Sequence, residues 1–204
     1  MQFITLLNKL GRWLEYLLTG QSDFRLHTTS TQRVELIEHD LQVKEALRQV
    51  RSYLKGKFSI QLRNPIVVRL DRPQTKSWKW RWTSRFRHVG NYYTQPMGEM
   101  PAHMITILPG LERWKFQAVL CHELTHAYQS ERALLNHLRG YREGMARWVE
   151  YHFLLDHEHP QEARKLERIE DIMLGRMLHK ILAYEKEHGR RATCQWLEQL
   201  SATS

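Results

Sequence analysis

The spacing of hydrophobic residues along the chain predicts several helices. Apolar side chains recur every three or four positions in residues 3–18, with charged residues between them, which predicts an amphipathic helix. Residues 19–32 are polar and turn-rich, so we interpret residues 1–30 as a helix with its linker and residues 31–204 as one folded domain. The same helical period predicts further helices at about 32–54, 112–130, 141–155, 160–187 and 191–200.

Shorter apolar segments between these helices predict strands. Residues 66–70 are mostly β-branched, and residues 103–108 end at a Pro-Gly turn. Residues 78–82 alternate Trp with Lys or Arg, which is the period of a strand. Helices, then a few strands, then helices again indicate an α+β fold rather than an alternating parallel sheet.

Composition and charge narrow the class of protein. Hydrophobic residues make up 42% of the chain and charged residues 26%, which is typical of globular proteins. No apolar run approaches the roughly 20 residues of a membrane-spanning helix. The formal net charge of +9 favours an acidic partner, such as nucleic acid, a membrane surface or an acidic protein. The two cysteines, Cys121 and Cys194, form no disulfide framework, so we expect a cytoplasmic location.

The helix at residues 3–18 has two interpretations. Charged residues interrupt its apolar run and no small-residue cleavage site follows, which argues against a signal peptide. We favour a helix docked on the folded core. A weak peripheral contact with a membrane surface is the alternative.

Residues 122–126 read HELTH, which is an HExxH motif. Residues i and i+4 of a helix lie on one face, so His122 and His126 can bind one metal ion. Glu123 projects beside that face, where it can take a proton from water at the ion. A structural pair of histidines on a buried helix is the alternative, and a third ligand would decide between the two.

The next predicted helix supplies a candidate for that third ligand. The metzincin pattern would need Gly and His at positions that hold Gln129 and Arg132, so this pattern is excluded. Glu143 follows His126 at a distance that allows a connection and an antiparallel helix. Two His and one Glu would then form a three-ligand zinc site with the fourth position open.

The stretch from residue 108 onward resembles a known group of enzymes. It contains LPGL at 108–111, the HExxHA helix at 116–127 and Glu143-Gly144, in that order. This order resembles the peptidase domain of the plant growth-regulating LIM-domain metallopeptidases and their bacterial relatives, over about residues 33–200. The Glu143 helix also resembles the glutamate-ligand helix of thermolysin-clan aminopeptidases. The group has an acidic pair before the glycine, where this chain has Arg142 and Glu143.

This resemblance implies a zincin-like α+β fold, in which a small, mostly antiparallel sheet packs on the HExxH helix and the C-terminal part is helical. It implies one Zn²⁺ per chain bound by His122, His126 and Glu143, with Glu123 as the general base. The chemistry of these residue types agrees, because zinc lowers the pKa of its water to about 7 and a carboxylate can carry the proton to the leaving amine. The predicted function is zinc-dependent hydrolysis of a peptide or protein substrate.

Weaker signals complete the predicted site. Glu150 lies two helical turns after Glu143, so it is a candidate to orient a ligating histidine or to replace Glu143; a solvated residue is the alternative. Four residues are candidate hydrogen-bond donors to the transition-state oxyanion: Tyr141, Tyr151, Arg176 and His179. For each of them, a role in packing or at the surface is the alternative. The zincin resemblance also implies an edge strand that pairs with an extended substrate, made of His103, Met104, Ile105 and Thr106.

The basic aromatic segment at residues 76–87 supports a second function. Stackable aromatic rings among cations suit single-stranded nucleic acid, so a nucleic-acid-associated protease or regulator is an alternative. We favour a different interpretation of this segment, a strand with buried Trp side chains and solvated basic side chains. A third interpretation is that the segment forms a wall of the substrate cleft and selects acidic substrates. A non-catalytic zinc-binding interaction module is the last alternative, and the intact Glu123 argues against it.

Overall fold

The structure is a computed structural model, and it describes residues 35–71, 89–98, 100–168 and 174–201. These belong to the second of two units into which the chain divides, Met1–Arg33 and Val34–Ser204. The predicted helix at 3–18 with its linker, the predicted strand at 78–82 and the whole basic aromatic segment lie outside the described residues.

Strand β4 lies in the centre of a three-stranded sheet of order β2-β4-β3. β2 (Ile66–Leu70) runs parallel to β4 (Met100–Ile107), and β3 (Gly90–Met97) forms an antiparallel hairpin with it. The predicted strand at 66–70 is confirmed, and the strand predicted at 103–108 begins earlier, at Met100. The three-stranded sheet is mixed: the longer pairing, β3 with β4, is antiparallel as expected, and the pairing of β2 with β4 is parallel.

Most predicted helices are confirmed, with changes at their ends. The described helices are α2 (Asp40–Phe58), α3 (Arg113–Glu131), α4 (Arg139–Asp156), α5 (Pro160–Glu167), α6 (Leu174–His188) and α7 (Arg190–Leu200). The single helix predicted at 160–187 corresponds to α5 and α6, on either side of residues 169–173, which the structure does not describe. Among the described helices, none is long and apolar enough to cross a membrane.

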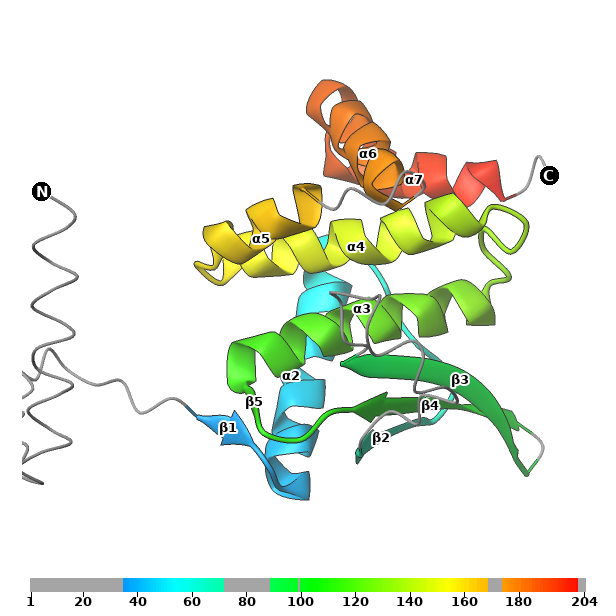
Figure 1. Ribbon diagram of the computed structural model, residues 1–204. Helices are drawn as coiled ribbons and strands as arrows, with labels where there is room; N and C mark the ends of the chain where they lie inside the picture. Colours follow the sequence, from blue (N-terminus) through cyan, green and yellow to red (C-terminus); the bar gives the residue numbers. More distant parts are fainter. Residues whose placement is uncertain (1–34, 72–88, 99, 169–173, 202–204) are drawn as a thin grey trace, which may run out of the picture. The chain divides into compact units, whose positions relative to one another are not determined.

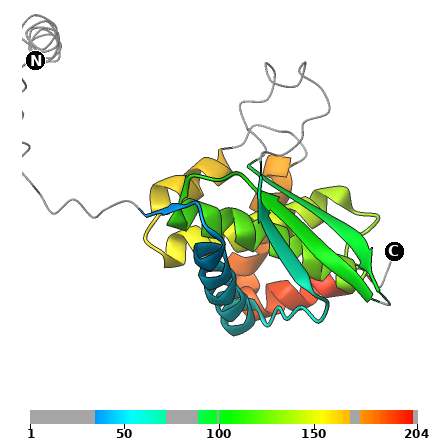
Figure 2. The ribbon, with the colours of Figure 1, turned by 90° about the horizontal axis from the view of Figure 1, so that it is seen from below.

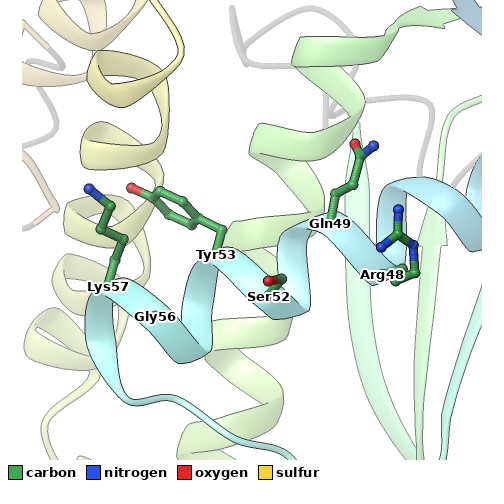
Figure 3. A pocket seen from close by; sticks show the side chains of 6 residues that line it. All are labelled: Arg48, Gln49, Ser52, Tyr53, Gly56 and Lys57. Carbon is green, nitrogen blue, oxygen red and sulfur yellow. The ribbon is translucent and has the colours of Figure 1, made fainter.

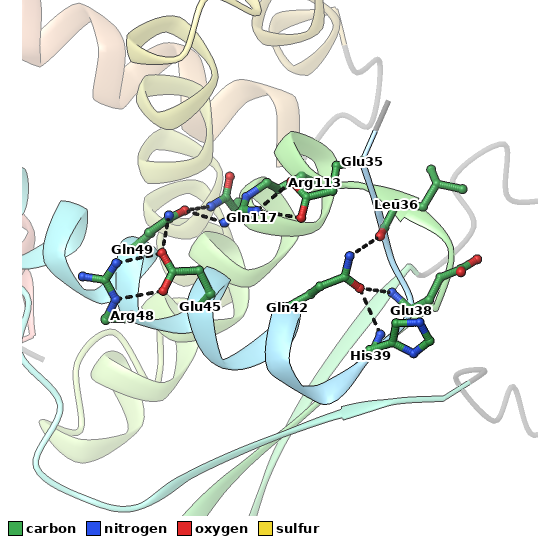
Figure 4. A network of polar contacts seen from close by, with 10 residues as sticks. All are labelled: Glu35, Leu36, Glu38, His39, Gln42, Glu45, Arg48, Gln49, Arg113 and Gln117. Atoms are coloured by element: carbon green, nitrogen blue, oxygen red, sulfur yellow. Dashed lines mark hydrogen bonds and ion pairs between the residues drawn. The ribbon is translucent and has the colours of Figure 1, made fainter. Parts of the chain in front are cut away.

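Helix α2 begins later than its hydrophobic pattern predicts. Residues at its expected start form strand β1 (Leu36–Ile37), which pairs antiparallel with β5 (Leu111–Glu112). Gln42 then caps the helix, because its Oε1 accepts hydrogen bonds from the backbone N–H groups of Glu38 and His39 at 3.0 and 3.1 Å (Figure 4). Leu36 and Ile37 therefore match the helical spacing of apolar residues but belong to β1, which is why the helix was predicted to begin too early.

Helix α3 lies in the middle of the described unit. Figure 1 shows it between the sheet and α4, with α6 and α7 beyond α4, and Figure 2 shows the strands in front of it. Its buried residues extend around most of its circumference and include Phe116, Leu120, Leu124 and Ala127. Close packing on two sides holds a helix firmly, so the side chains that α3 projects toward α4 have defined positions.

Polar contacts also fix α2 against α3. Gln117 Nε2 donates to Gln49 Oε1 at 2.6 Å, and Arg113 Nη1 donates to both Glu35 carboxylate oxygens at 2.7 and 2.8 Å (Figure 4). These contacts join the start of the described chain to the first turns of the HExxH helix.

Candidate metal centre

Two histidines and one glutamate from neighbouring helices come together in the structure. We call this group of side chains, His122, His126 and Glu143, the metal cluster. α3 projects His122 and His126 from successive turns, and α4 projects Glu143 toward them. The two Nε2 atoms lie 3.1 Å apart. Glu143 Oε1 lies 3.3 Å from Nε2 of His122, and its Oε2 lies 3.3 Å from Nε2 of His126. Among the described residues, this is the one group of three that could hold a metal ion.

These separations fit a tetrahedral zinc ion. Bonds of about 2.0–2.1 Å at tetrahedral angles place donor atoms about 3.3 Å apart. The two Nε2 atoms are 3.1 Å apart, and each lies 3.3 Å from its nearest carboxylate oxygen, Oε1 for His122 and Oε2 for His126, which is close to that value. Two imidazoles and one carboxylate are also a donor set that catalytic zinc sites use. The residues present therefore fit the ion that the sequence predicts.

Hydrogen bonds on the far side of each ring determine its tautomer. Glu150 Oε2 lies 3.0 Å from Nδ1 of His122, and a carboxylate oxygen accepts, so Nδ1 carries a proton. Gln129 Oε1 lies 2.8 Å from Nδ1 of His126, while Gln129 Nε2 donates to the Arg142 carbonyl at 2.8 Å. Both rings are thus oriented with Nε2 toward the same point, as metal ligation requires.

The carboxylates around the histidines control their charge. Burial alone lowers the pKa of His122, but hydrogen bonds with Glu143 and Glu150 outweigh burial and hold this pKa well above its usual value. Burial alone raises the pKa of Glu143, but hydrogen bonds from the two histidines outweigh it and hold this pKa well below its usual range. The cluster therefore favours positive charge at its centre, and a bound cation would displace protons from it.

Glu123 lies against the backbone of β3. Its side chain is buried, and burial raises the pKa of its carboxyl above the usual value. A Cβ atom at Gly90 would lie 2.7 Å from Glu123 Oε1 and 2.5 Å from Val119 Cγ1, so only a glycine permits this approach. The fold thus places a carboxylate of raised proton affinity against β3, where it interacts electrostatically with His122, His126 and Glu143.

The four predicted oxyanion donors are Tyr141, Tyr151, Arg176 and His179. Tyr141 packs edge-on against Trp196, and Tyr151 packs edge-on against His152. Burial, and next a hydrogen bond with Glu167, raise the pKa of Tyr151. His179 Nε2 donates to the Glu167 carbonyl at 2.9 Å, and Arg176 is exposed. These contacts do not involve the metal cluster, so the oxyanion role stays a prediction.

The predicted substrate strand does not lie at a sheet edge. His103, Met104, Ile105 and Thr106 belong to β4, which pairs with β2 on one side and β3 on the other. Both edges of β4 are therefore hydrogen-bonded, and an incoming peptide has no place there. The two edges of the sheet belong to β2 and β3, because both strands pair with β4 and not with each other.

His103 belongs to a buried polar network that the sequence did not reveal. Its Nε2 lies 2.9 Å from Glu131 Oε1, and its Nδ1 lies 3.0 Å from the Tyr92 hydroxyl. Glu131 also accepts hydrogen bonds from the backbone N–H groups of Arg63 and Asn64 at 2.8–3.0 Å. The network joins the sheet to the end of α3, and its members are too distant in sequence for any local pattern to connect them.

Two residues beside the metal cluster were also not predicted. Gln129 follows His126 by three positions, so helical spacing alone could have identified it as a neighbour. Arg147 follows Glu143 by one helical turn, and its Nε lies 3.6 Å from Glu143 Oε1.

A separate shallow hollow lies along α2 (Figure 3). Its lining comes from this helix and consists of Arg48, Gln49, Ser52, Tyr53, Gly56 and Lys57. None of these residues belongs to the metal cluster or to the site predicted from the sequence.

Comparisons of the chain with protein-family models, curated proteins and solved structures found no match. The function is therefore argued from the geometry and chemistry of the cluster.

Proposed function

We propose that the protein is a zinc-dependent peptidase that uses a water molecule to hydrolyse peptide bonds. The observation that carries this proposal is the meeting of His122, His126 and Glu143, whose ligand atoms lie within 4.8 Å of one another. The buried Glu123 beside them supplies the second part of the chemistry. A purely structural zinc site would have four protein ligands and would need no base.

Each residue of the cluster has a role in this proposal. A zinc ion held by His122, His126 and Glu143 would lower the pKa of water to about 7 and polarise the substrate carbonyl. Glu123 accepts a proton from the attacking water and passes it to the leaving amine, for which its raised pKa is suited. Glu150 and Gln129 hold the two imidazoles in orientation through Nδ1.

Strand β3 is the proposed docking edge for the substrate. Its one pairing among the described strands is with β4, so its other edge offers backbone N–H and C=O groups to an extended peptide. One end of this strand, at Gly90, lies against Glu123. A peptide paired with β3 would therefore pass close to the base and the metal cluster.

A zincin-like fold is part of the same proposal. An HExxH helix packed on a sheet, an antiparallel edge strand and a glutamate ligand on the next helix support it, together with the resemblance to the LIM-domain metallopeptidases. Similarity of fold does not by itself establish an activity, so the proposed function depends on the residues of the metal cluster and on Glu123.

The first test is the metal content of the purified protein, measured by plasma mass spectrometry. We expect one zinc per wild-type chain and a large loss in Glu143→Ala. Glu187→Ala is the matched control, because Glu187 is exposed on α6 and its removal should leave the zinc content unchanged. No zinc after metal-supplemented purification would contradict the proposal.

The second test is hydrolysis of labelled casein and of mixed fluorogenic peptides. We expect cleavage by the zinc-loaded wild type and its loss in Glu123→Gln with the zinc content retained. Zinc binding without any cleavage would favour the non-catalytic binding module instead.

A further inference from the structure

Strand β3 directs a defined set of backbone groups away from β4. In an antiparallel pair, facing residues alternate between hydrogen-bonded and non-hydrogen-bonded positions. The N–H of Leu108 donates to the Val89 carbonyl at 2.9 Å, so Val89 is a bonded position. Gly90, Tyr92 and Thr94 then occupy non-bonded positions, and their N–H and C=O groups point toward the other edge of β3.

Two further observations agree with this register. Pro96 faces Pro101, and neither proline has an N–H group, so this pair is also non-bonded. His103, the partner of Thr94, uses its N–H on the other side of β4, where it donates to the Pro65 carbonyl at 2.8 Å. The edge of β3 that pairs with no described strand thus offers both backbone groups at three alternate residues, and Pro96, which has only a carbonyl, ends this set.

Tyr92, the middle residue of these three, attaches β3 to the interior. It is partly buried, whereas Gly90 has no side chain and the other side chains of β3 are exposed. The Tyr92 hydroxyl lies 3.0 Å from Nδ1 of the buried His103. Burial raises the pKa of this hydroxyl above its usual value, so the hydroxyl stays protonated and can donate.

His103 is itself held by Glu131, at the end of α3. A carboxylate oxygen accepts, so the 2.9 Å contact with Glu131 Oε1 places a proton on His103 Nε2 and leaves Nδ1 of the neutral ring as an acceptor for Tyr92. Glu131 also accepts hydrogen bonds from the backbone N–H groups of Arg63 and Asn64, so contacts outside β3 fix its position. Tyr92 is therefore bonded to a support that the rest of the unit holds in place.

We propose that Tyr92 is a positioning residue for the substrate, and that its bond to His103 holds the free backbone groups of β3 in place for an extended peptide. This inference rests on the proposed peptidase function. A strand bonded on one side has fewer restraints than a central strand, so a side-chain anchor at its middle lowers the cost of ordering it when a peptide binds. Gly90, two residues before Tyr92, lies against Glu123, so a shift of β3 would also move the peptide relative to the base.

Peptide binding, measured separately from cleavage, tests this inference. The protein is the full chain with Glu123→Gln, so that bound peptide is not consumed, and its zinc content is measured first. One probe is a pool of random, proline-free peptides. The other is the same pool with every backbone nitrogen methylated, which removes the donors that pairing with a strand edge requires. Equilibrium dialysis compares the two pools.

We expect the unmethylated pool to bind and the methylated pool not to bind. Adding Tyr92→Phe should weaken binding of the unmethylated pool by about three- to tenfold, as the loss of one hydrogen bond predicts, with the zinc content unchanged. In the protein with Glu123 intact, the same substitution should raise KM for fluorogenic peptides by a similar factor and leave kcat unchanged. Tyr184→Phe is the matched control, since it removes the same hydroxyl from a partly buried tyrosine on α6, outside the sheet.

Several outcomes would overturn the inference. The Tyr92→Phe and Tyr184→Phe proteins could bind peptides equally, the two pools could bind equally, or neither pool could bind. A joint fall of kcat and zinc content in Tyr92→Phe would make the Tyr92–His103 contact a general support of the fold. Peptide binding that depends on Tyr92, in a protein whose wild type cleaves nothing, would uphold the positioning role while the peptidase function fails. Cleavage that Tyr92→Phe leaves unchanged would uphold the peptidase function without this role.

Discussion

Each histidine of the metal cluster is oriented by a side chain that does not reach the metal position. Glu150 accepts a hydrogen bond from His122 Nδ1, and Gln129 accepts one from His126 Nδ1. Gln129 is fully buried and also bonds the backbone of α4, so it connects ring orientation to helix packing. If zinc binds as proposed, its binding depends on these two partners as well as on the histidines themselves.

Removal of Glu150 should weaken zinc binding. We expect Glu150→Ala to reduce zinc affinity by about 10–100-fold, because His122 loses the acceptor that fixes its tautomer and orientation. Competition with a chromophoric chelator measures this affinity. Glu187→Ala, an exposed glutamate on α6, should be unchanged, and an equal effect of both variants would contradict the orienting role.

Gly90→Ala should impair activity while zinc stays bound. The added Cβ would lie 2.7 Å from Glu123 Oε1, so either the base or β3 must move, at a cost of about 1–3 kcal/mol of stability. Peptide cleavage measures the activity, plasma mass spectrometry measures the bound zinc, and chemical denaturation measures the stability. Gly56→Ala is the control, because nothing lies within 4 Å of its added Cβ, and inside a helix it should stabilise by about 0.5–1 kcal/mol.

At the scale of the helices, a buried network holds α6 and α7 against α4. Glu185 Oε2 accepts hydrogen bonds from Trp148 Nε1 at 2.8 Å and from His152 Nε2 at 2.7 Å. Arg190, at the start of α7, donates to His152 Nδ1 at 2.8 Å and pairs with Glu185 and Asp156. A single carboxylate thus joins residues of three helices, and its charge state affects their packing.

This network should make the fold sensitive to acid. Burial alone raises the pKa of Glu185, but hydrogen bonds from His152 and Trp148 outweigh it and lower this pKa. A lowered folded pKa means that the stability from this carboxylate is present above its ordinary pKa and is lost as pH falls through the folded value. We expect Glu185→Gln to reduce stability by about 1–3 kcal/mol at pH 7 and to flatten the loss between about pH 5 and 3. Urea denaturation across this range measures both, and parallel pH curves for the two proteins would contradict the assignment.

For the whole molecule, the proposed zinc site would join α3 and α4, which pack together in the described unit. α3 contributes two ligands and α4 the third, so zinc would bind the folded chain and not the unfolded one. Ligand binding of this kind stabilises the folded state by mass action.

Zinc removal should therefore lower the melting temperature. Free zinc at 100 times its dissociation constant would stabilise the protein by about 2.7 kcal/mol, which corresponds to several degrees for a domain of this size. Thermal scans with zinc and with a chelator measure the difference. Glu143→Ala should show almost no difference between the two conditions, and a shift equal to that of the wild type would place the stabilising metal elsewhere.

The sequence alone determined the parts of the molecule that depend on local spacing. The helical period located α3 and α4 to within a few residues, since side chains three and four positions apart share a face whatever lies around them. That period placed His122 and His126 on one face, and the search for a third ligand led to Glu143, which the structure brings within 3.3 Å of both rings. β2 was also found, because its short apolar run stands between turn residues.

Only the tertiary structure decided which strand lies at the edge and which groups surround the cluster. Strand order depends on how distant segments pair, and no local period records that β4 lies between β2 and β3. The same holds for the approach of Gly90 to Glu123 and for the His103–Glu131 contact. Each of these depends on where backbones far apart in sequence come to rest, which side-chain packing of the whole unit determines.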